Sequence, residues 1–170
     1  MAAQQCLFEK LSGGMMMLCR RYVKNQGDAE ERLQDRFYKF FKKLPVFNYQ
    51  GKAALFAWLK NIMINECLMQ LRKKNVFSIV SESAATDLIL EADAPDNLYA
   101  GEIFNLLVQL PVGYRRVFNL YSIEGMAHKE IPALLGIAEG TSKSQLSKAK
   151  SLLQKLLLAK GNEYVKRQSK

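Results

Sequence analysis

The stretch KEIPALLGIAEGTSKSQLSKAKSLLQKLLLAK, residues 129–160, decides the fold of the C-terminal part of this chain. Its apolar residues predict a short helix at about 129–135, which Gly136 ends, and a long helix at about 139–160. A short helix, a tight turn that contains glycine and a longer helix together are typical of a helix-turn-helix. Such patterns also recur by chance in helical proteins, so an ordinary helical pair is the alternative interpretation.

The long helix of this motif is expected to have two different faces. One face forms an inward stripe at helical spacing, made of Ser142, Leu146, Ala149, Leu153 and Leu156. Another side carries small hydroxyl groups and lysines, namely Ser144, Ser147, Lys148 and Ser151, with Lys143 and Lys150 beside them. Small hydroxyls and lysines can approach a major groove closely and donate to phosphates and base edges. A solvated helix face with lysines on it is the alternative.

Helical spacing of apolar residues continues through most of the chain, and glycine and proline are sparse. We therefore expect an all-α protein. Further helices are predicted at residues 5–24, 28–44, 53–74, 103–110 and 113–123. Asp28 is the expected N-cap of the second of these helices, and Pro45 is expected to stop it.

Charge divides the chain into three parts. Residues 1–74 carry fourteen Lys and Arg against six Asp and Glu, residues 75–104 carry none against six, and residues 105–170 carry eleven against four. We predict a first small helical domain at 1–74, an acidic flexible linker at 75–97 and a second domain, with the helix-turn-helix, at 98–170. The net charge of +9 and the pI near 9.5 favour a polyanionic partner, although basic proteins without a nucleic-acid role also exist.

The sequence argues against a catalytic or metal-binding protein. Three cysteines lie far apart without a C-x-x-C pair, which favours reduced thiols in a cytosol over a disulfide framework or zinc site. His128 is the single histidine, and neither a phosphate-binding P-loop nor a nucleophile elbow occurs. No apolar run is long enough for a membrane span, and no leader opens the chain. We expect a cytoplasmic protein that is not an enzyme and needs no cofactor or metal.

Aromatic side chains gather with amides and lysines in the middle of the first domain. The cluster comprises Phe47, Asn48, Tyr49, Lys52, Phe56, Trp58, Lys60, Asn61 and Asn65. Aromatic rings stack on unpaired bases and lysines hold the backbone, so single-stranded nucleic acid is a sensible ligand. For Phe56 and Trp58 a place in the core is the stronger interpretation. His128 is either a phosphate contact or merely exposed.

Several stretches resemble extracytoplasmic-function (ECF) sigma factors of bacterial RNA polymerase. DAEERLQDRF at 28–37 resembles their core-polymerase-binding helix. WLKNIMIN at 58–65 with LRKK at 71–74 resembles their promoter-melting, −10-reading helix. The segments LPVGYRRVF (110–118), EGMAHKEI (124–131) and LGIAEGT (135–141) resemble their −35-binding domain. The matches fall in both domains in the right order, which a generic helix-turn-helix protein would not show.

The resemblance implies a two-domain factor that binds core RNA polymerase and directs initiation at promoters, with an anti-sigma factor as a further candidate partner. It implies core binding by Glu31, Leu33, Gln34, Asp35 and Phe37. It implies contacts with the single-stranded −10 element by Asn48, Tyr49, Gln50, Lys60, Asn61 and Asn65. It implies contacts with the duplex −35 element by Thr141, Lys143, Ser144, Ser147, Lys148 and Lys150.

The chain departs from the family pattern at three places. Its recognition helix has lysines where arginines are common, and lysine lacks the bidentate fork, so guanine recognition is expected to be weaker or differently placed. Arg32 and Arg36 stand where apolar or small residues are usual. Pro132 stands where alanine is common, and we expect it to fall in the first turn of a short helix that lacks a Ser or Thr cap, because Ala127 occupies that place.

Two other classes of protein remain as alternatives. A regulator could bind DNA through the C-terminal helix-turn-helix alone and use its front half for dimerisation or sensing, but this leaves the aromatic–asparagine cluster and residues 28–37 without a role. A helical adaptor that binds only proteins leaves both basic blocks unexplained.

Overall fold

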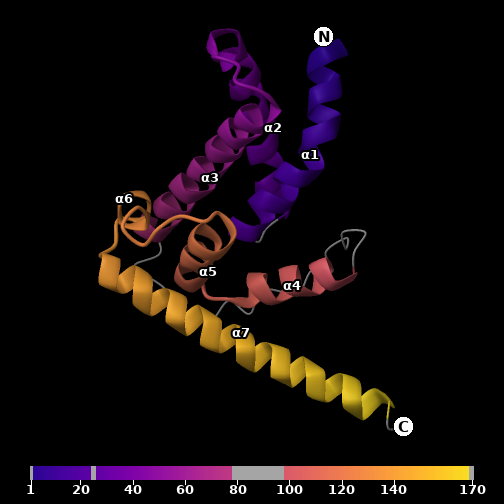
Figure 1. The fold of residues 1–170 in the computed structure, drawn as a ribbon, viewed down its shortest axis with the longest axis vertical. Coiled ribbons are helices and arrows are strands. Elements are labelled where there is room, and N and C mark those ends of the chain that lie inside the picture. Colours follow the sequence, from indigo (N-terminus) through magenta and orange to yellow (C-terminus); the bar gives the residue numbers. More distant parts are fainter. Residues whose placement is uncertain (1, 24–25, 78–97, 169–170) are drawn as a thin grey trace. The chain divides into compact units, whose positions relative to one another are not determined.

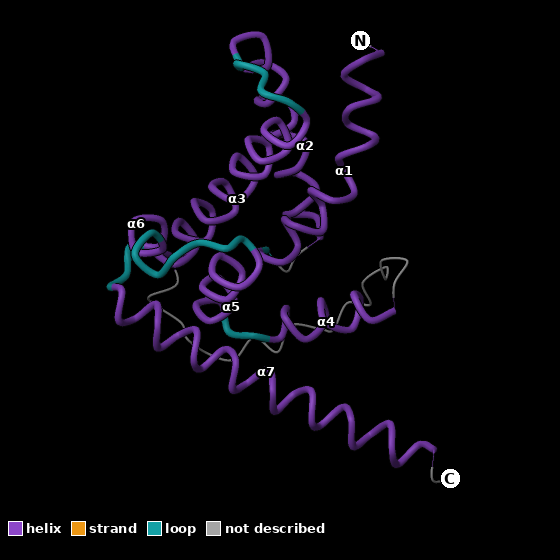
Figure 2. The backbone as a smooth tube through the Cα atoms, in the orientation of Figure 1, coloured by secondary structure: helices purple, strands orange, loops and turns teal. Residues whose placement is uncertain are grey.

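The computed structural model describes residues 2–23, 26–77 and 98–168, and every regular element in these ranges is helical. The expected all-α fold class is therefore confirmed (Figures 1 and 2). The chain divides into two compact units, residues 1–84 and 85–170. Residues 78–97, which hold most of the predicted acidic linker, lie outside the described ranges, and residues 75–77 belong to a helix.

The first unit is a three-helix bundle. Its elements are α1 (Ala2–Tyr22), α2 (Gln26–Lys43), the short 3₁₀-helix η1 (Leu44–Val46) and α3 (Lys52–Phe77). Each of the three α-helices packs against the other two. The largest fully buried side chains of this core are Met15, Tyr22, Phe37, Phe40, Leu59, Met63 and Leu68. Phe8 meets the edge of Phe37 with ring centroids 4.7 Å apart, a geometry that favours aromatic pairs.

Of two expectations about the ends of α2, the one for its N-terminus is wrong and the one for its C-terminus is confirmed. Asp28 lies inside the first turn of α2 and does not cap it, because the helix already begins at Gln26, whose amide donates to Glu30 at 2.9 Å. Asp28 still lies where a negative charge opposes the helix dipole. As expected, α2 ends before Pro45, at Lys43, and Pro45 fits the first turn of η1, where its missing N–H costs nothing.

A buried ion pair joins α2 to α3. Arg36 Nη2 contacts Glu66 Oε1, and the two side chains are only 11% and 7% exposed. This pair explains why an arginine stands on the inner side of α2: its charge is matched within the bundle. Removing one partner of such a pair leaves an uncompensated buried charge, which is strongly destabilising.

Cys19 and Cys67 also meet between helices of this bundle, on α1 and α3. Both are buried and free, whereas Cys6 is exposed. The hydrogen bond with Cys19 and the burial of the side chain raise the pKa of the Cys67 thiol well above its ordinary value. Reduced thiols were expected because the cysteines lie far apart in the sequence, but the fold brings Cys19 and Cys67 together.

The second unit contains α4 (Leu98–Gln109), α5 (Val112–Phe118), the π-helix η3 (Asn119–Ile123), α6 (Ile131–Leu135) and α7 (Glu139–Gln168). Leu107, Leu110 and Ala149 form its buried centre, with Tyr114, Phe118, Leu152 and Leu153 packed around them. Arg115 fixes the turn between α4 and α5, because its Nη1 donates to the carbonyl oxygens of Val108 (2.9 Å) and Leu110 (3.3 Å).

The helix-turn-helix is formed by α6, the turn at residues 136–138 and α7. Gly136 ends α6 in the left-handed conformation with φ 67°, which costs a glycine little, and its N–H donates to the carbonyl of Pro132 at 2.9 Å. Pro132 lies in the first turn of α6, as expected. No side chain caps this helix: the N–H of Ala127 donates to Glu130 Oε2 at 2.7 Å, and the carbonyl of Ala127 accepts from the N–H of Glu130 at 2.9 Å.

Candidate nucleic-acid interfaces

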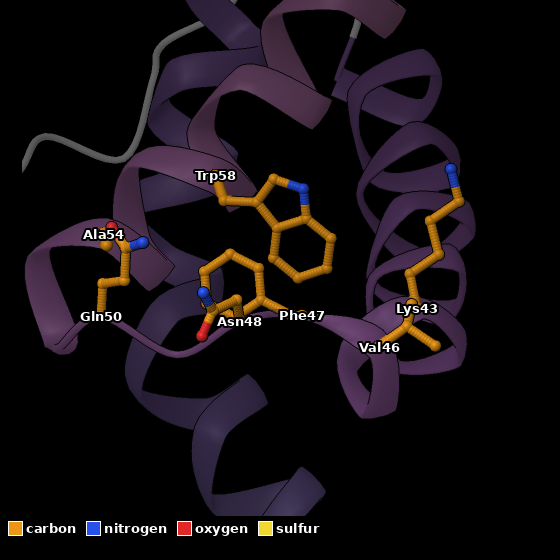
Figure 3. A pocket seen from close by; sticks show the side chains of 7 residues that line it. All are labelled: Lys43, Val46, Phe47, Asn48, Gln50, Ala54 and Trp58. Atoms are coloured by element: carbon orange, nitrogen blue, oxygen red, sulfur yellow. The ribbon is translucent and has the colours of Figure 1, made fainter.

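The first unit contains a hollow of about 380 Å³ beside the loop that joins η1 to α3 (Figure 3). Its lining residues are Lys43, Val46, Phe47, Asn48, Gln50, Ala54 and Trp58. The rings of Phe47 and Trp58 stack with centroids 4.4 Å apart and 11° between their planes. Phe40 supports Trp58 from the core at 5.1 Å. The hollow therefore combines a flat aromatic surface with two amides and one lysine.

Backbone interactions hold this loop at both ends. The N–H of Phe47 donates to the carbonyl of Leu44 at 3.1 Å, which places Phe47 directly after η1. At the other end Gly51 has φ 102°, a conformation that favours glycine, and its carbonyl accepts from Leu55 at 3.2 Å as α3 begins. Asn48 and Gln50 are thereby carried to the rim of the hollow.

The structure brings only some of the expected −10 residues to this hollow. Asn48 and Gln50 line it, whereas Tyr49 is 61% exposed and belongs to the same loop without lining the hollow. Asn61 and Asn65 are exposed one turn apart on α3, and Lys60 is half-buried. Lys43 and Ala54 were not expected there, since no spacing in the sequence shows which side chains a loop will meet.

The two aromatic residues of α3 have different environments. Trp58 is half-buried and packed between Phe40 and Phe47, which agrees with the stronger interpretation of Trp58 as a core residue. Phe56 is 44% exposed, so the same interpretation is wrong for Phe56. The difference follows from helical geometry, because two residues along a helix turn by about 200°.

The helix α2 places the expected core-binding residues on two different sides. Glu31, Gln34 and Asp35 are exposed, as is Tyr38 at 67%. Leu33 and Phe37 are only 5% and 2% exposed, because they pack inside the three-helix bundle. Leu33 and Phe37 therefore hold the helix in place, and direct contact of their side chains with a partner is not available to them.

The helix α7 carries the expected two faces. Ser142, Leu146 and Ala149 are buried and Leu153 and Leu156 are half-buried, so the predicted inward stripe is confirmed. All six residues expected to contact the −35 element are exposed: Thr141, Lys143, Ser144, Ser147, Lys148 and Lys150. Gln145 lies between the two faces, and its side chain packs so closely on α5 that a Cβ at Gly113 would lie 3.2 Å from its Nε2.

Interactions within α7 arrange part of this exposed face. Lys143 Nζ contacts Glu139 Oε1 at 2.7 Å, one turn earlier. The hydrogen bond and the charge of Lys143 lower the pKa of the Glu139 carboxyl, so Glu139 stays ionised at the helix N-terminus. The hydroxyl of Ser144 donates to the carbonyl of Thr141 at 3.0 Å. Lys150 Nζ lies 5.9 Å from the centroid of the Tyr121 ring.

His128 is not merely exposed, which was one of the two descriptions expected for it. It is half-buried, its ring stacks on Tyr121 with centroids 4.3 Å apart, and its Nδ1 is hydrogen-bonded to Ser142 Oγ at 2.9 Å. The sequence alone could not show this contact, because fourteen residues separate the two partners.

Two family models match the chain, one in each unit. The model of Sigma-70 region 2 covers residues 7–76, and that of Sigma-70, region 4 covers residues 100–153. The ECF RNA polymerase sigma factor SigM of Mycobacterium tuberculosis (strain H37Rv) is 26% identical over 160 residues, covering 89% of this chain and 75% of the relative. The chain belongs to the ECF sigma factors of the sigma-70 family. Its function is to direct promoter-specific transcription initiation.

Further relatives agree with this family. The ECF RNA polymerase sigma-E factor of Escherichia coli (strain K12) is 28% identical over 149 residues, covering 80% of this ECF chain and 76% of the relative. Among solved structures, the sigma factor RpoE of Bartonella quintana, in complex with the anti-sigma factor NepR, is similar in fold. Its TM-score is 0.60 at 24% identity, over 92% of this chain and 98% of that one.

The family match decides between the alternatives left by the sequence. A regulator with a lone helix-turn-helix would not match region 2 across α1, α2 and α3.

In the described ranges, no group of three His, Cys, Asp or Glu residues is arranged to hold a metal ion. Within the same part of this sigma factor, no helix is both long and apolar enough to cross a membrane.

Proposed function

We propose that this sigma factor recognises promoters with two separate surfaces, the hollow of the first unit and the exposed face of α7. The hollow takes an unpaired base of the −10 element, and α7 enters the major groove of the −35 element. The observation that carries the proposal is the contrast of their side chains: stacked aromatic rings with amides at one site, hydroxyls and lysines on a helix at the other.

The hollow suits a base that has left the double helix. Bases stack on aromatic rings regardless of sequence, whereas amides can distinguish base edges by their donors and acceptors. Phe47, backed by Trp58, supplies the ring, and Asn48 and Gln50 supply the amides. Tyr49, on the same loop, is exposed and free to stack on a neighbouring base. Lys60, Asn61 and Asn65 on α3 complete the proposed path of the strand.

The first turns of α7 suit a duplex groove. Residues near the N-terminus of a recognition helix point at base edges, and short side chains let the helix approach closely. Lys143, Ser144, Ser147 and Lys148 are proposed to contact bases. Thr141 and Lys150 are proposed to hold phosphates, which position the helix without reading sequence.

Core RNA polymerase is the proposed protein partner, bound by the outer side of α2. Glu31, Gln34 and Asp35 offer an exposed polar and acidic surface there. Such a surface is complementary to a basic partner. An anti-sigma factor is a second proposed partner, because the similar RpoE structure of Bartonella quintana contains NepR.

The domain boundaries, the cellular location and the absence of enzyme activity are part of the same proposal. The domains are 1–74 for core binding and the −10 element, 75–97 as an acidic linker and 98–170 for the −35 element. The protein acts in the cytoplasm, where its polymerase is, and it is not itself an enzyme.

Reconstituted transcription tests the proposed function. The purified chain is added to core RNA polymerase with genomic DNA as template, and the 5′ ends of the transcripts are mapped. We expect new start sites that share one −10 and one −35 sequence. Core polymerase alone is the control, and an unchanged set of 5′ ends would overturn the proposal.

A further inference from the structure

A hydrogen bond joins the turn before α6 to the first turn of α7. His128 lies in the turn that precedes α6, and Ser142 lies in the first turn of α7. Their atoms Nδ1 and Oγ are 2.9 Å apart, and Ser142 is completely buried. Because Ser142 has no access to water, its hydroxyl depends on partners within the protein.

The imidazole ring of His128 also makes a stacking contact. It stacks on the ring of Tyr121 at 4.3 Å with 23° between the planes, and Tyr121 belongs to the preceding helix η3. Lys150 Nζ lies 5.9 Å from the centroid of the same tyrosine ring. Ser142 and Lys150 both belong to α7. His128 and Tyr121 therefore meet this helix at two residues that lie eight positions apart.

These two places flank the residues proposed to read the −35 element. Ser144, Ser147 and Lys148 all lie between Ser142 and Lys150 in the sequence. The rest of the motif is short, since α6 has only five residues and ends at Gly136. Contacts that recognise a ligand must be held to about 0.5 Å, so a side chain that fixes the start of α7 affects every base contact made by that helix.

We propose that His128 is a positioning residue for −35 recognition: through its hydrogen bond to Ser142 it sets the orientation of α7 in the major groove. The inference rests on the proposed function, because it requires that α7 reads the −35 element. His128 acts through α7 and makes no base contact of its own. The edge of its ring makes the hydrogen bond to Ser142, and the face of its ring stacks on Tyr121.

Three variants separate these two contacts. His128→Phe keeps a ring for the stack and removes the hydrogen bond. His128→Asn places an amide atom at the position of Nδ1, so it restores the hydrogen bond and removes the stack. Ser142→Ala removes the partner hydroxyl and leaves His128 intact. The double variant of His128→Phe with Ser142→Ala completes a cycle that isolates the pair.

The cycle is measured on holoenzyme made from the full chain and core polymerase, with a randomised −35 library upstream of a constant −10 element. His128→Phe and Ser142→Ala should each weaken binding of the preferred −35 sequence about five-fold, the effect of one hydrogen bond. Each should also broaden base preference. The double variant should be no worse than either single variant, and His128→Asn should retain the wild-type preference.

A second measurement is made without DNA. His128 is the single histidine of the chain, so ¹⁵N NMR of its imidazole gives one Nδ1 signal. Ser142→Ala should shift that signal in the full chain. An unchanged signal would overturn the proposed contact even if a His128 variant failed to fold.

Other outcomes of the library experiment would also overturn the positioning role. Additive effects in the cycle, or wild-type preference in both single variants, would show that the pair does not act on α7. A fall in the salt dependence of binding by about one unit would make His128 a direct phosphate contact. In these cases wild-type holoenzyme still selects a −35 sequence and the proposed function stands, whereas wild-type holoenzyme without −35 selection would overturn both.

Discussion

The two units of this sigma factor present nucleic acid with opposite kinds of surface. The first offers a concave site, where Phe47 and Trp58 stack beside a hollow of about 380 Å³. The second offers the convex side of a helix, where Ser144, Ser147 and Lys148 are exposed. A hollow can enclose only a base that has left its stack, and a helix with short side chains can enter an intact groove. The shapes of the two surfaces therefore support the proposed roles, with an unpaired base at the hollow and an intact groove at α7.

The units also differ in how each buries an arginine. Arg36 is matched by the carboxylate of Glu66, on another helix of its bundle. Arg115 is matched by the carbonyl oxygens of Val108 and Leu110, in the adjacent turn. A side-chain partner such as Glu66 can be removed by substitution, so the contribution of the Arg36–Glu66 pair to the first unit can be measured directly.

Glu66→Ala is expected to have the largest effect, because it leaves the charge of Arg36 buried without its partner. We expect the free energy of unfolding of the first unit to fall by about 3–5 kcal/mol. Chemical denaturation of the full chain, followed through the single tryptophan at 58, measures this. Glu31→Ala is the matched control, since its 3.5 Å contact with Arg32 has a carboxylate that is 64% exposed, and equal losses for both variants would contradict the account.

Replacing both Gln34 and Asp35 with lysine is expected to have the next largest effect, on binding to core polymerase. The change places positive charge against a partner that we expect to be basic, which should weaken association at least about ten-fold, or ~1.4 kcal/mol. Affinity is measured by titrating labelled chain with core polymerase. Replacing Lys39 and Lys42 with glutamine on the same helix provides a comparison. Unchanged affinity of the first variant would exclude this part of α2 from the interface.

Tyr49→Ala tests whether the loop beside the hollow stacks on the unpaired strand. If the exposed ring stacks on an unpaired base, its loss should cost about 1–3 kcal/mol of promoter opening. Permanganate footprinting of the mutant holoenzyme reports the melted bases. Tyr49→Phe keeps the ring and serves as the control. Wild-type reactivity in the Tyr49 variant would mean that the strand is held by the hollow without Tyr49.

Lys148→Ala and Lys150→Ala distinguish base contacts from phosphate contacts on the exposed face of α7. We place their effects on −35 binding last in this order. Loss of Lys150 should weaken all −35 sequences alike and reduce the salt slope by about one unit. Loss of Lys148 should change the preferred sequence, at a cost of about 1–3 kcal/mol for the original one. Selection from a randomised −35 library distinguishes the two. If both variants keep the wild-type preference, these lysines do not read bases.

Much of the fold follows from the sequence, because apolar spacing specifies helices. The inward stripe of α7 was predicted residue by residue, and Pro132 was correctly expected in the first turn of α6. The resemblance to the family assigned core binding to α2 but could not distinguish its outer side, so Leu33 and Phe37 were included although both are buried.

The candidate sites were harder to predict than the helices that carry them. The hollow depends on Lys43 and Trp58, which come from different helices, and the hydrogen bond from His128 to Ser142 spans fourteen residues. Local spacing gives no information about such pairs. Their positions follow from how the helices pack and from the loops that connect them.

The division of labour between the two units is tested most directly by comparing two probes with the same holoenzymes. One probe is a single strand with the −10 sequence and the other is a duplex with the −35 sequence, both taken from mapped promoters. We expect Tyr49→Ala to weaken binding of the single strand alone and Lys148→Ala to weaken binding of the duplex alone. If both variants weakened the same probe, or each weakened both probes equally, the separate roles of the two surfaces would be contradicted.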